Sequence, residues 1–259
     1  NYDRGNGWAL ALDANGNVLW QREYDQHGVE KLWGGAALPG GDLALAGDSR
    51  VAVNTANEKI DMPDGLLLRI NANDGLDGCP CQFFVDQPAA PTPSDLAAAA
   101  TLSDNGVVAV GFAAGDNGLA NGWLHAIHAD GSPRWDKLVA KQGTDKFKGA
   151  ARNGQGLNIA VGSSDSASAG GLDGWAVLFD ANGNVLIDKS YGGSEDDELL
   201  AVQALPNGGW VAAGRSATAS KGKTDGWVIG LDEGLNLLWE HRQGDKDSDE
   251  LLGVTVVGW

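Results

Sequence analysis

Short apolar segments alternate with turns rich in glycine, asparagine and aspartate along the whole chain. In the clearest stretch the apolar segments are 175–179, 185–191, 199–205 and 210–214. Runs of this length between such turns are typical of antiparallel β-strands, and no intervening segment has a helical pattern. The pattern therefore predicts an all-β chain folded as a meander.

The same pattern recurs along the chain. A glycine followed by Trp or Leu opens each copy, at intervals of 58, 57, 52 and 52 residues; these glycines are Gly7, Gly65, Gly122, Gly174 and Gly226. A period of this size predicts a β-propeller of about five four-stranded blades of 52–58 residues, either complete or part of a larger ring. We expect residues 1–259 to form a single propeller domain, as a fragment or mature portion of a longer chain.

Two further features recur and favour a propeller over an open sandwich. Small residues crowd the third segment of each copy, as at 34–37 and 97–100, where innermost strands would approach closely at a central axis. The fourth segment ends in glycine each time, which predicts a shared backbone constraint. We expect the recurrent tryptophans to pack the blades together; they are Trp8, Trp20, Trp123, Trp135, Trp175, Trp227 and Trp239.

The two ends of the chain share one blade in this scheme. Segment 251–257 matches the small-residue strands, so we expect it to join segments 8–12 and 18–24. Such a blade lacks one strand. The sequence thus predicts completion by a strand from another chain or segment, and a longer parent ring is the alternative.

The stretch DGWAVLFDANGNVLIDKSYGGSEDDELLAVQALPNGGWVAAG, residues 173–214, resembles the bacterial β-propeller repeat that runs Asp-x-Trp/Phe-Val, Gly-Asn, Tyr-Gly-Gly, Asp and Gly-Gly-x-x-x-x-Gly. The resemblance implies a secreted, periplasmic or cell-surface bacterial protein and no particular activity. WALALDANGNVLWQ, residues 8–21, is also similar to the tryptophan motif of pyrroloquinoline-quinone propellers. Those enzymes have eight blades, so we expect shared blade packing and no shared cofactor.

Charge narrows the range of partners. The formal net charge is −17, from 35 acidic and 18 basic residues. Such a surface repels nucleic acid and anionic lipid, and no apolar run is long enough to insert into a membrane. The remaining partner classes are protein and carbohydrate.

The DANGN motif, residues 180–184, resembles the start of a calcium loop. An EF-type loop would need Gly at 185 and Glu at 191, where the chain has Val185 and Tyr191. The motif lies between two apolar segments, and its Asn-Gly pair predicts a two-residue type I′ turn.

Carboxylates recur just before the small-residue segments. Glu30, Asp145, Asp197 and Asp249 share one register, with Ser94 in the remaining copy. Around a channel mouth they could bind calcium, which makes them the metal candidates. Alternatively, each caps its own turn by accepting loop N–H groups.

Features that do not repeat are the binding candidates: Trp33, Arg134, Glu195 and Asp196. The basic patch Lys141, Lys146 and Lys148 and the loop pair Cys79 and Cys81 also lack counterparts. His125 and His128 would point to opposite faces of one strand, so they are not a ligand pair.

No catalytic or cofactor-binding pattern emerges from the sequence. The function we expect is a non-catalytic binding, interaction or assembly module. Two alternatives stay open, a five-bladed glycoside hydrolase-like enzyme and a calcium-stabilised adhesion propeller.

Overall fold

The computed structural model describes residues 5–24, 29–38, 41–54, 59–85, 94–116, 118–139, 141–166 and 170–257, with the side chains of 51–63 and 77–85 outside the description. These residues form eighteen strands and no helix that could span a membrane. The strands are β1 (Gly7–Leu12), β2 (Val18–Tyr24), β3 (Val29–Ala37), β4 (Asp42–Asn54), β5 (Lys59–Asn71), β6 (Asp77–Val85), β7 (Ser94–Thr101), β8 (Val107–Ala114), β9 (Ala120–Ile127), β10 (Pro133–Val139), β11 (Asp145–Arg152), β12 (Asn158–Ser164), β13 (Asp173–Phe179), β14 (Val185–Tyr191), β15 (Asp197–Ala204), β16 (Trp210–Ser216), β17 (Asp225–Leu231) and β18 (Leu237–Gln243).

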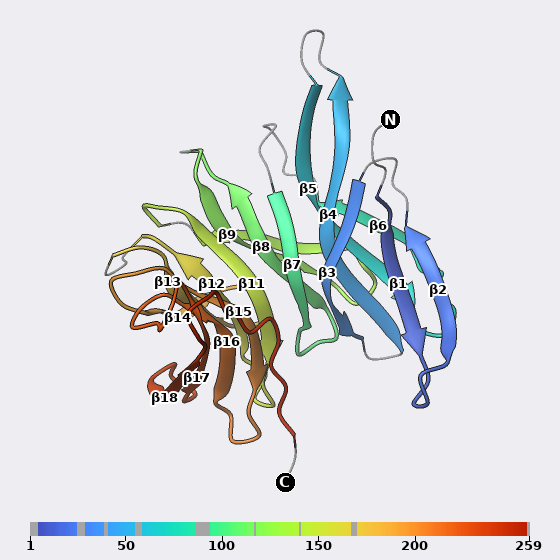
Figure 1. Ribbon diagram of the computed structural model, residues 1–259. Helices are drawn as coiled ribbons and strands as arrows, with labels where there is room; N and C mark the ends of the chain where they lie inside the picture. The colour runs from blue at the N-terminus through green and yellow to red at the C-terminus, as the bar shows by residue number, and fades with distance from the viewer. Residues whose placement is uncertain are drawn as a thin grey trace.

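The strands form five antiparallel sheets. Four are four-stranded, in the orders β3-β4-β5-β6, β7-β8-β9-β10, β11-β12-β13-β14 and β15-β16-β17-β18, and the fifth is the hairpin β1-β2. The sheets stand side by side as the blades of a β-propeller (Figure 1), which confirms the predicted fold class. The blades form an open arc, with the β1-β2 hairpin at one end and the β15–β18 blade at the other.

Each complete blade begins with its small-residue strand. The inner strands β3, β7, β11 and β15 contact one another along the axis. A Cβ atom at Gly34 would lie 2.9 Å from the Ala97 carbonyl oxygen, and one at Gly149 would lie 3.1 Å from the Ala201 Cα. The small side chains therefore allow the inner strands to approach, as the sequence predicts.

The recurrent glycine of each second strand lies inside the strand, opposite a β-bulge in the inner strand beside it. Gly47, Gly111, Gly162 and Gly214 each lie next to a register shift in the inner strand. A Cβ atom at Gly162 would lie 1.9 Å from the Lys146 carbonyl oxygen, and the other three are equally close to the inner strand. No side chain fits there.

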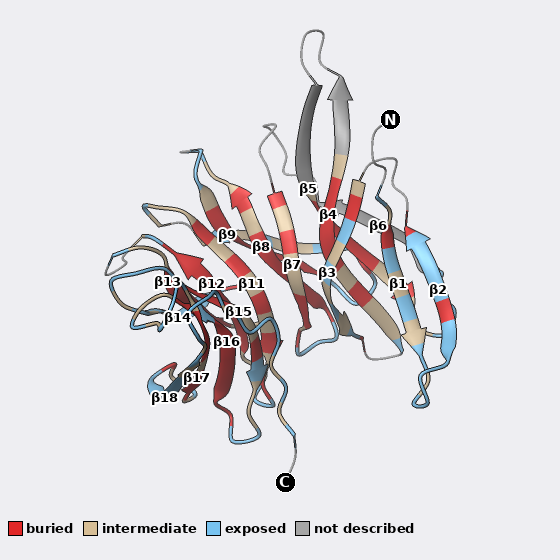
Figure 2. Ribbon diagram, in the orientation of Figure 1, coloured by how far each residue is buried: buried red, intermediate tan, exposed pale blue. Residues whose placement is uncertain are grey.

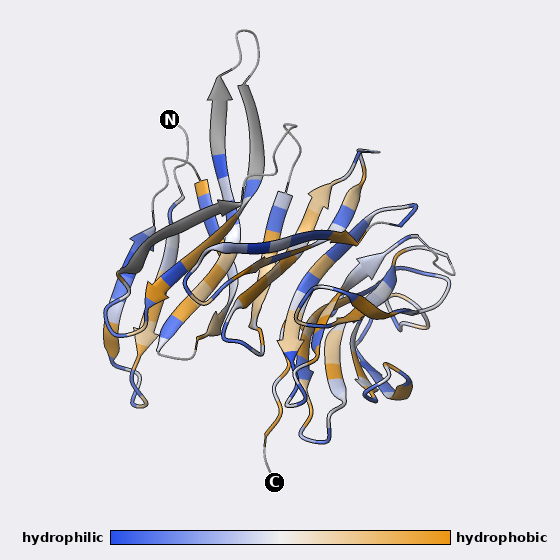
Figure 3. Cartoon of the chain, turned by 180° about the vertical axis from the view of Figure 1, so that it is seen from behind, coloured by the Kyte–Doolittle hydropathy of each residue, from blue (hydrophilic) through white to orange (hydrophobic). Residues whose placement is uncertain are grey.

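Blades pack through a tryptophan of one and a glycine of the preceding one. Trp123, Trp175 and Trp227 are fully buried, and their rings lie where Cβ atoms of Gly65, Gly122 and Gly174 would be. Trp175 also stacks on Phe147, with ring centroids 4.3 Å apart. These rings carry the apolar cores between blades, which appear red in Figure 2 and orange in Figure 3.

Two of the tryptophans expected in the core are exposed. Trp8 is 55% exposed and Trp239 is 47% exposed, so that expectation is wrong for both. Trp8 lies on β1 and Trp239 on β18, in the sheets that end the arc. No described blade precedes the sheet of Trp8, and none follows the sheet of Trp239.

A second contact joins neighbouring blades. Each of the first four blades donates a hydrogen bond to a carbonyl in the hairpin turn of the next blade. The bonds run from Trp20 Nε1 to Ala72 (2.7 Å), from Arg69 to Ala129, from Trp135 Nε1 to Ala181 (3.0 Å) and from the Tyr191 hydroxyl to Leu235 (2.6 Å). The DANGN motif therefore forms a turn and also accepts a hydrogen bond from the preceding blade.

The turn itself differs from the predicted type I′. In both DANGN turns the glycine has a positive φ, 85° at Gly16 and 74° at Gly183, and the asparagine does not. Asp180 Oδ1 accepts hydrogen bonds from the backbone N–H groups of Asn182 (2.8 Å) and Asn184 (2.9 Å). This aspartate stabilises a wider loop that leaves only one residue in the left-handed region.

Two other expectations are corrected. Segment 251–257 forms no strand, because it makes no ladder with a described strand; its Leu251 N–H donates to the Gly214 carbonyl (3.0 Å) and holds the segment to the last blade. Cys79 and Cys81 lie on strand β6 and not in a loop, with their side chains outside the described part.

The bulge contact can be tested at Gly162. We expect Gly162→Ala to lower the free energy of unfolding by about 3 kcal/mol, because the added methyl group overlaps the Lys146 carbonyl. Chemical denaturation measures the change. Gly154→Ala is the control, since a Cβ atom there meets nothing within 4 Å. Equal stability of the two variants would contradict the role given to the bulge.

Candidate functional site

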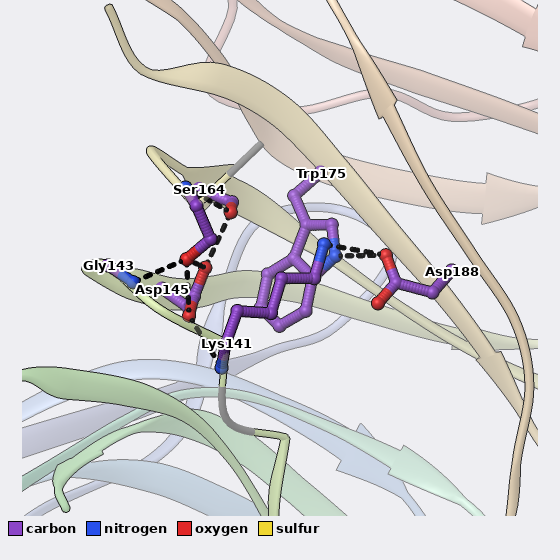
Figure 4. Close-up of polar contacts among 7 residues, drawn as sticks. Lys141, Gly143, Asp145, Ser164, Trp175 and Asp188 are labelled. Carbon is purple, nitrogen blue, oxygen red and sulfur yellow. Dashed lines mark hydrogen bonds and ion pairs between the residues drawn. The ribbon is translucent and has the colours of Figure 1, made fainter. Parts of the chain in front are cut away.

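The recurrent carboxylates cap loops within their own blades. Asp145 is buried and accepts hydrogen bonds from the hydroxyls of Ser164 and Ser166 and from the Lys141 N–H (Figure 4). Its oxygens are therefore already used by protein donors, as the turn-capping interpretation predicts.

The other members of this register lie in comparable surroundings. Asp197 accepts from the Gly193 N–H (2.9 Å) and the Thr218 hydroxyl (2.8 Å), Glu30 from the Ser49 hydroxyl (3.0 Å), and Asp249 from the Asp245 N–H (3.0 Å). Within the described ranges, no three His, Cys, Asp or Glu residues gather where they could hold a metal ion. The calcium site stays a prediction without a place in the described structure.

Three buried tryptophans, Trp123, Trp175 and Trp227, each donate an indole hydrogen bond to the acidic residue thirteen positions later. Trp175 Nε1 donates to Asp188 Oδ1 (2.8 Å), and Lys141 Nζ lies 2.8 Å from the same oxygen and 4.9 Å from the ring centroid (Figure 4). Trp123 with Asp136 and Trp227 with Glu240 repeat the pair, at 2.6 Å and 3.3 Å. Lys141 therefore belongs to blade packing, although the sequence grouped it with Lys146 and Lys148.

The histidines are separated by the end of the strand. His125 lies on β9 with Nδ1 3.1 Å from Asp136 Oδ1, whereas His128 is exposed in the following turn. The placement of both on one strand was wrong, because β9 ends at Ile127.

The four binding candidates are not joined by the described contacts. Arg134 pairs with Asp104 (2.6 Å), and Asp196 Oδ1 accepts from the Leu172 N–H (2.8 Å). Glu195 lies in the same loop as Asp196, where its N–H donates to the Thr218 hydroxyl (3.3 Å). Of the four, Trp33 is the one that lies at the axis.

A row of charged side chains at the axis comes from the opposite face of the inner strands, and Asp48, Arg50 and Arg215 add to it from the second strands β4 and β16. Because side chains alternate along a strand, the residues that follow the capping register point the other way: Lys31, Asp95, Lys146, Glu198 and Glu250. We define the axial belt as Asp48, Arg50, Asp95, Lys146, Lys148, Glu198 and Arg215. Side-chain alternation along the inner strands is the sequence signal that could have identified their members of the axial belt.

A cleft of about 390 Å³ opens between β11 and β15 at this belt. Arg215 lines the cleft, with Nη2 2.8 Å from Glu198 Oε2 and Nη1 3.6 Å from Glu250 Oε2. The Ser163 hydroxyl donates to Glu198 Oε1 (3.3 Å). The lining residues are Thr144, Lys146, Lys148, Ser163, Leu172, Glu198, Leu200, Arg215, Glu250 and Leu252.

A smaller cavity of about 190 Å³ adjoins the cleft, since Lys148 and Leu200 line both. Trp33 lines it opposite small residues of all four inner strands. The Trp33 indole is 55% exposed, and its Nε1 donates to Asp48 Oδ1 (2.7 Å). An anchored and exposed aromatic face thus adjoins a cleft of mixed charge, and we call the two cavities together the axial site.

Asp95 is the titratable group that stands out in the belt. Burial raises its pKa, and Asp48 adds to the effect while Lys148, Lys146 and Arg50 oppose it. Asp95 Oδ1 has no hydrogen-bond partner among the described residues. A carboxyl group in such surroundings keeps its proton more readily than an exposed one.

The raised pKa predicts a pH-dependent effect on stability. The native state binds this proton more tightly than the unfolded state, so ionisation of Asp95 costs stability as the pH rises above its ordinary pKa of 3.8. We therefore expect Asp95→Asn to gain in melting temperature over the parent between about pH 4 and about pH 7. Asp116→Asn, which removes one exposed carboxyl group, is the control. A flat difference for Asp95→Asn would contradict the burial effect.

Comparison with known proteins supports the fold and goes no further. No family model matches the sequence, and no curated protein matches it. A crystal structure of a protein of unknown function from Dyadobacter fermentans is similar, with 11% identity, a TM-score of 0.56 and coverage of 88% of this chain and 71% of that chain.

Two glycoside hydrolases give weaker structural matches. One is a GH43 β-xylosidase/α-arabinofuranosidase from a compost microbial metagenome, with 12% identity, coverage of 79% of this chain and 75% of that chain, and a TM-score of 0.49. The other is a Bombyx mori GH32 β-fructofuranosidase, with 14% identity, coverage of 85% and 46%, and a TM-score of 0.44. The class that the five sheets of the structure define is an open β-propeller.

Proposed function

We propose that this chain is a non-catalytic binding module of a secreted or surface bacterial protein, and that it binds its ligand at the axial site. The supporting observation is the convergence of unrepeated side chains there. Trp33, Lys148 and Arg215 differ from their counterparts in the other blades, yet they line two adjoining cavities. Residues that only hold blades together would repeat with the blades.

The chemistry of the axial site fits an oligosaccharide. A sugar ring has an apolar face that can lie on an exposed indole, and hydroxyl groups that both donate and accept hydrogen bonds. Trp33 offers the indole, Lys146 and Lys148 offer donors, and Glu250 offers an acceptor. Neighbouring charges of opposite sign favour a polar, uncharged ligand over a strongly ionic one.

Binding without turnover is proposed because both carboxylates of the cleft form ion pairs with the same cation. Glu198 and Glu250 both face Arg215. A hydrolase needs one carboxyl group as an acid and a second as a base or nucleophile. A glycosidase is the second candidate function, favoured by Asp95, whose raised pKa would suit an acid.

The experiment measures binding and hydrolysis on the same panel of soluble oligosaccharides, by calorimetry and by mass spectrometry of the sugars. We expect saturable binding without new products. Trp33→Ala and Arg215→Met should each weaken binding at least tenfold, about 1.4 kcal/mol. Trp239→Ala is the matched control, because Trp239 is similarly exposed but lies on β18, away from the axial cavities.

Two results would contradict the proposal. Hydrolysis that disappears in Asp95→Asn or Glu198→Gln would establish the glycosidase in its place. Failure of every oligosaccharide to bind would exclude carbohydrate as the ligand of the axial site.

A further inference from the structure

The end of the arc at β18 carries an unused copy of the contact that joins blades. Trp20, Trp135 and Trp239 lie thirteen residues after the glycines that open their copies. Trp20 and Trp135 donate to the turn of the next blade, to the carbonyls of Ala72 and Ala181. Trp239 lies over Gly230 and is 47% exposed, with no described blade beyond it.

The other end of the arc carries a turn like those that accept these hydrogen bonds. The turn at residues 13–17, which we call the first turn, has the same DANGN sequence as the turn that receives Trp135. The residue at the corner of each later turn is buried, namely Gly75, Gly131, Gly183 and Leu235. Gly16 alone of these five corners is exposed, and a Cβ atom built on it meets nothing within 4 Å.

A second pair of surfaces repeats this complementarity. Within the arc, Gly65, Gly122 and Gly174 receive the tryptophan of the next blade, at 2.7–2.8 Å from a built Cβ atom. Gly226 is near Leu251 and meets no tryptophan. Trp8, the corresponding tryptophan of the β1-β2 hairpin, is 55% exposed on the same face of β1 as Leu10 and Leu12.

The two ends of one arc do not meet. They lie at opposite sides of the molecule (Figure 1), and the interfaces between blades are closed by fully buried tryptophans. Packed interfaces of this kind do not bend continuously, so the curvature of the arc is set. A surface that complements a different surface of the same protein joins separate copies in a heterologous contact.

We propose that two copies of this chain associate head to tail, with β18 of one copy packed on the first turn of the other. Trp239 then donates to the Ala14 carbonyl, as Trp135 does to Ala181. Trp8 of the receiving copy covers Gly226 of the donating copy. The contact buries the exposed indoles at both ends and repeats the geometry of the internal blade interfaces.

Sedimentation velocity tests the association, from about 1 to about 300 µM protein. We expect the average mass to rise with concentration above the 26.8 kDa of one chain. Trp239→Ala disables one end and Trp8→Glu the other, so each alone should associate at least tenfold more weakly. Leu186→Ala is the control, since Leu186 is similarly exposed but lies on β14 within the arc, and it should leave association unchanged.

Mixing the two disabled variants gives the decisive result. Each variant retains one intact end. An equimolar mixture should therefore form heterodimers and no assembly larger than a dimer. A constant monomer mass for the parent chain would overturn the proposal, including the case in which one chain closes on itself. A mixture that stays monomeric would overturn the head-to-tail arrangement.

Discussion

Blade-to-blade contact is the constraint on which the rest of this structure depends. A four-stranded sheet buries one face only if another sheet covers it, and here each sheet covers the next. The contact has two parts, a tryptophan over the opening glycine of the preceding blade and a side chain that donates to a turn carbonyl of the following blade. Both parts recur with the sequence period. The period of the chain is therefore the period of its interfaces.

The same constraint separates structural from functional polar groups. Carboxylates that repeat, such as Asp145 and Asp188, are occupied by hydroxyl, amide or indole donors of neighbouring strands. Charged groups that differ between blades belong to the axial belt, such as Asp95 on the inner strand β7 and Arg215 on the second strand β16. Within the inner strands, side-chain alternation places the capping carboxylates and the charged residues that follow them on opposite sides of the same backbone.

The fold could be predicted from the sequence because its signals are local. Strand patterns, turn residues and the bulge glycines depend on neighbours within one blade, so Gly162 and Gly183 were informative alone. Exposure of Trp8 and Trp239 could not be predicted, because it depends on whether another blade covers them. The sequence singled out Trp33, Lys146 and Lys148, but it did not bring them together with Asp95 and Arg215 in one axial site. Asp95 and Arg215 share no register with each other, and only the convergence of several blades brings such residues to one place.

Native-state amide hydrogen exchange in dilute protein tests most directly whether blade contacts stabilise the chain. Strands β12 and β13 are buried throughout and have blades on both sides, whereas β1 and β2 have a neighbour on one side and are largely exposed. The account predicts slowest exchange in residues 158–164 and 173–179 and much faster exchange in 7–12 and 18–24. Equal protection of the two sets would contradict it, because each sheet would then be stable without its neighbours.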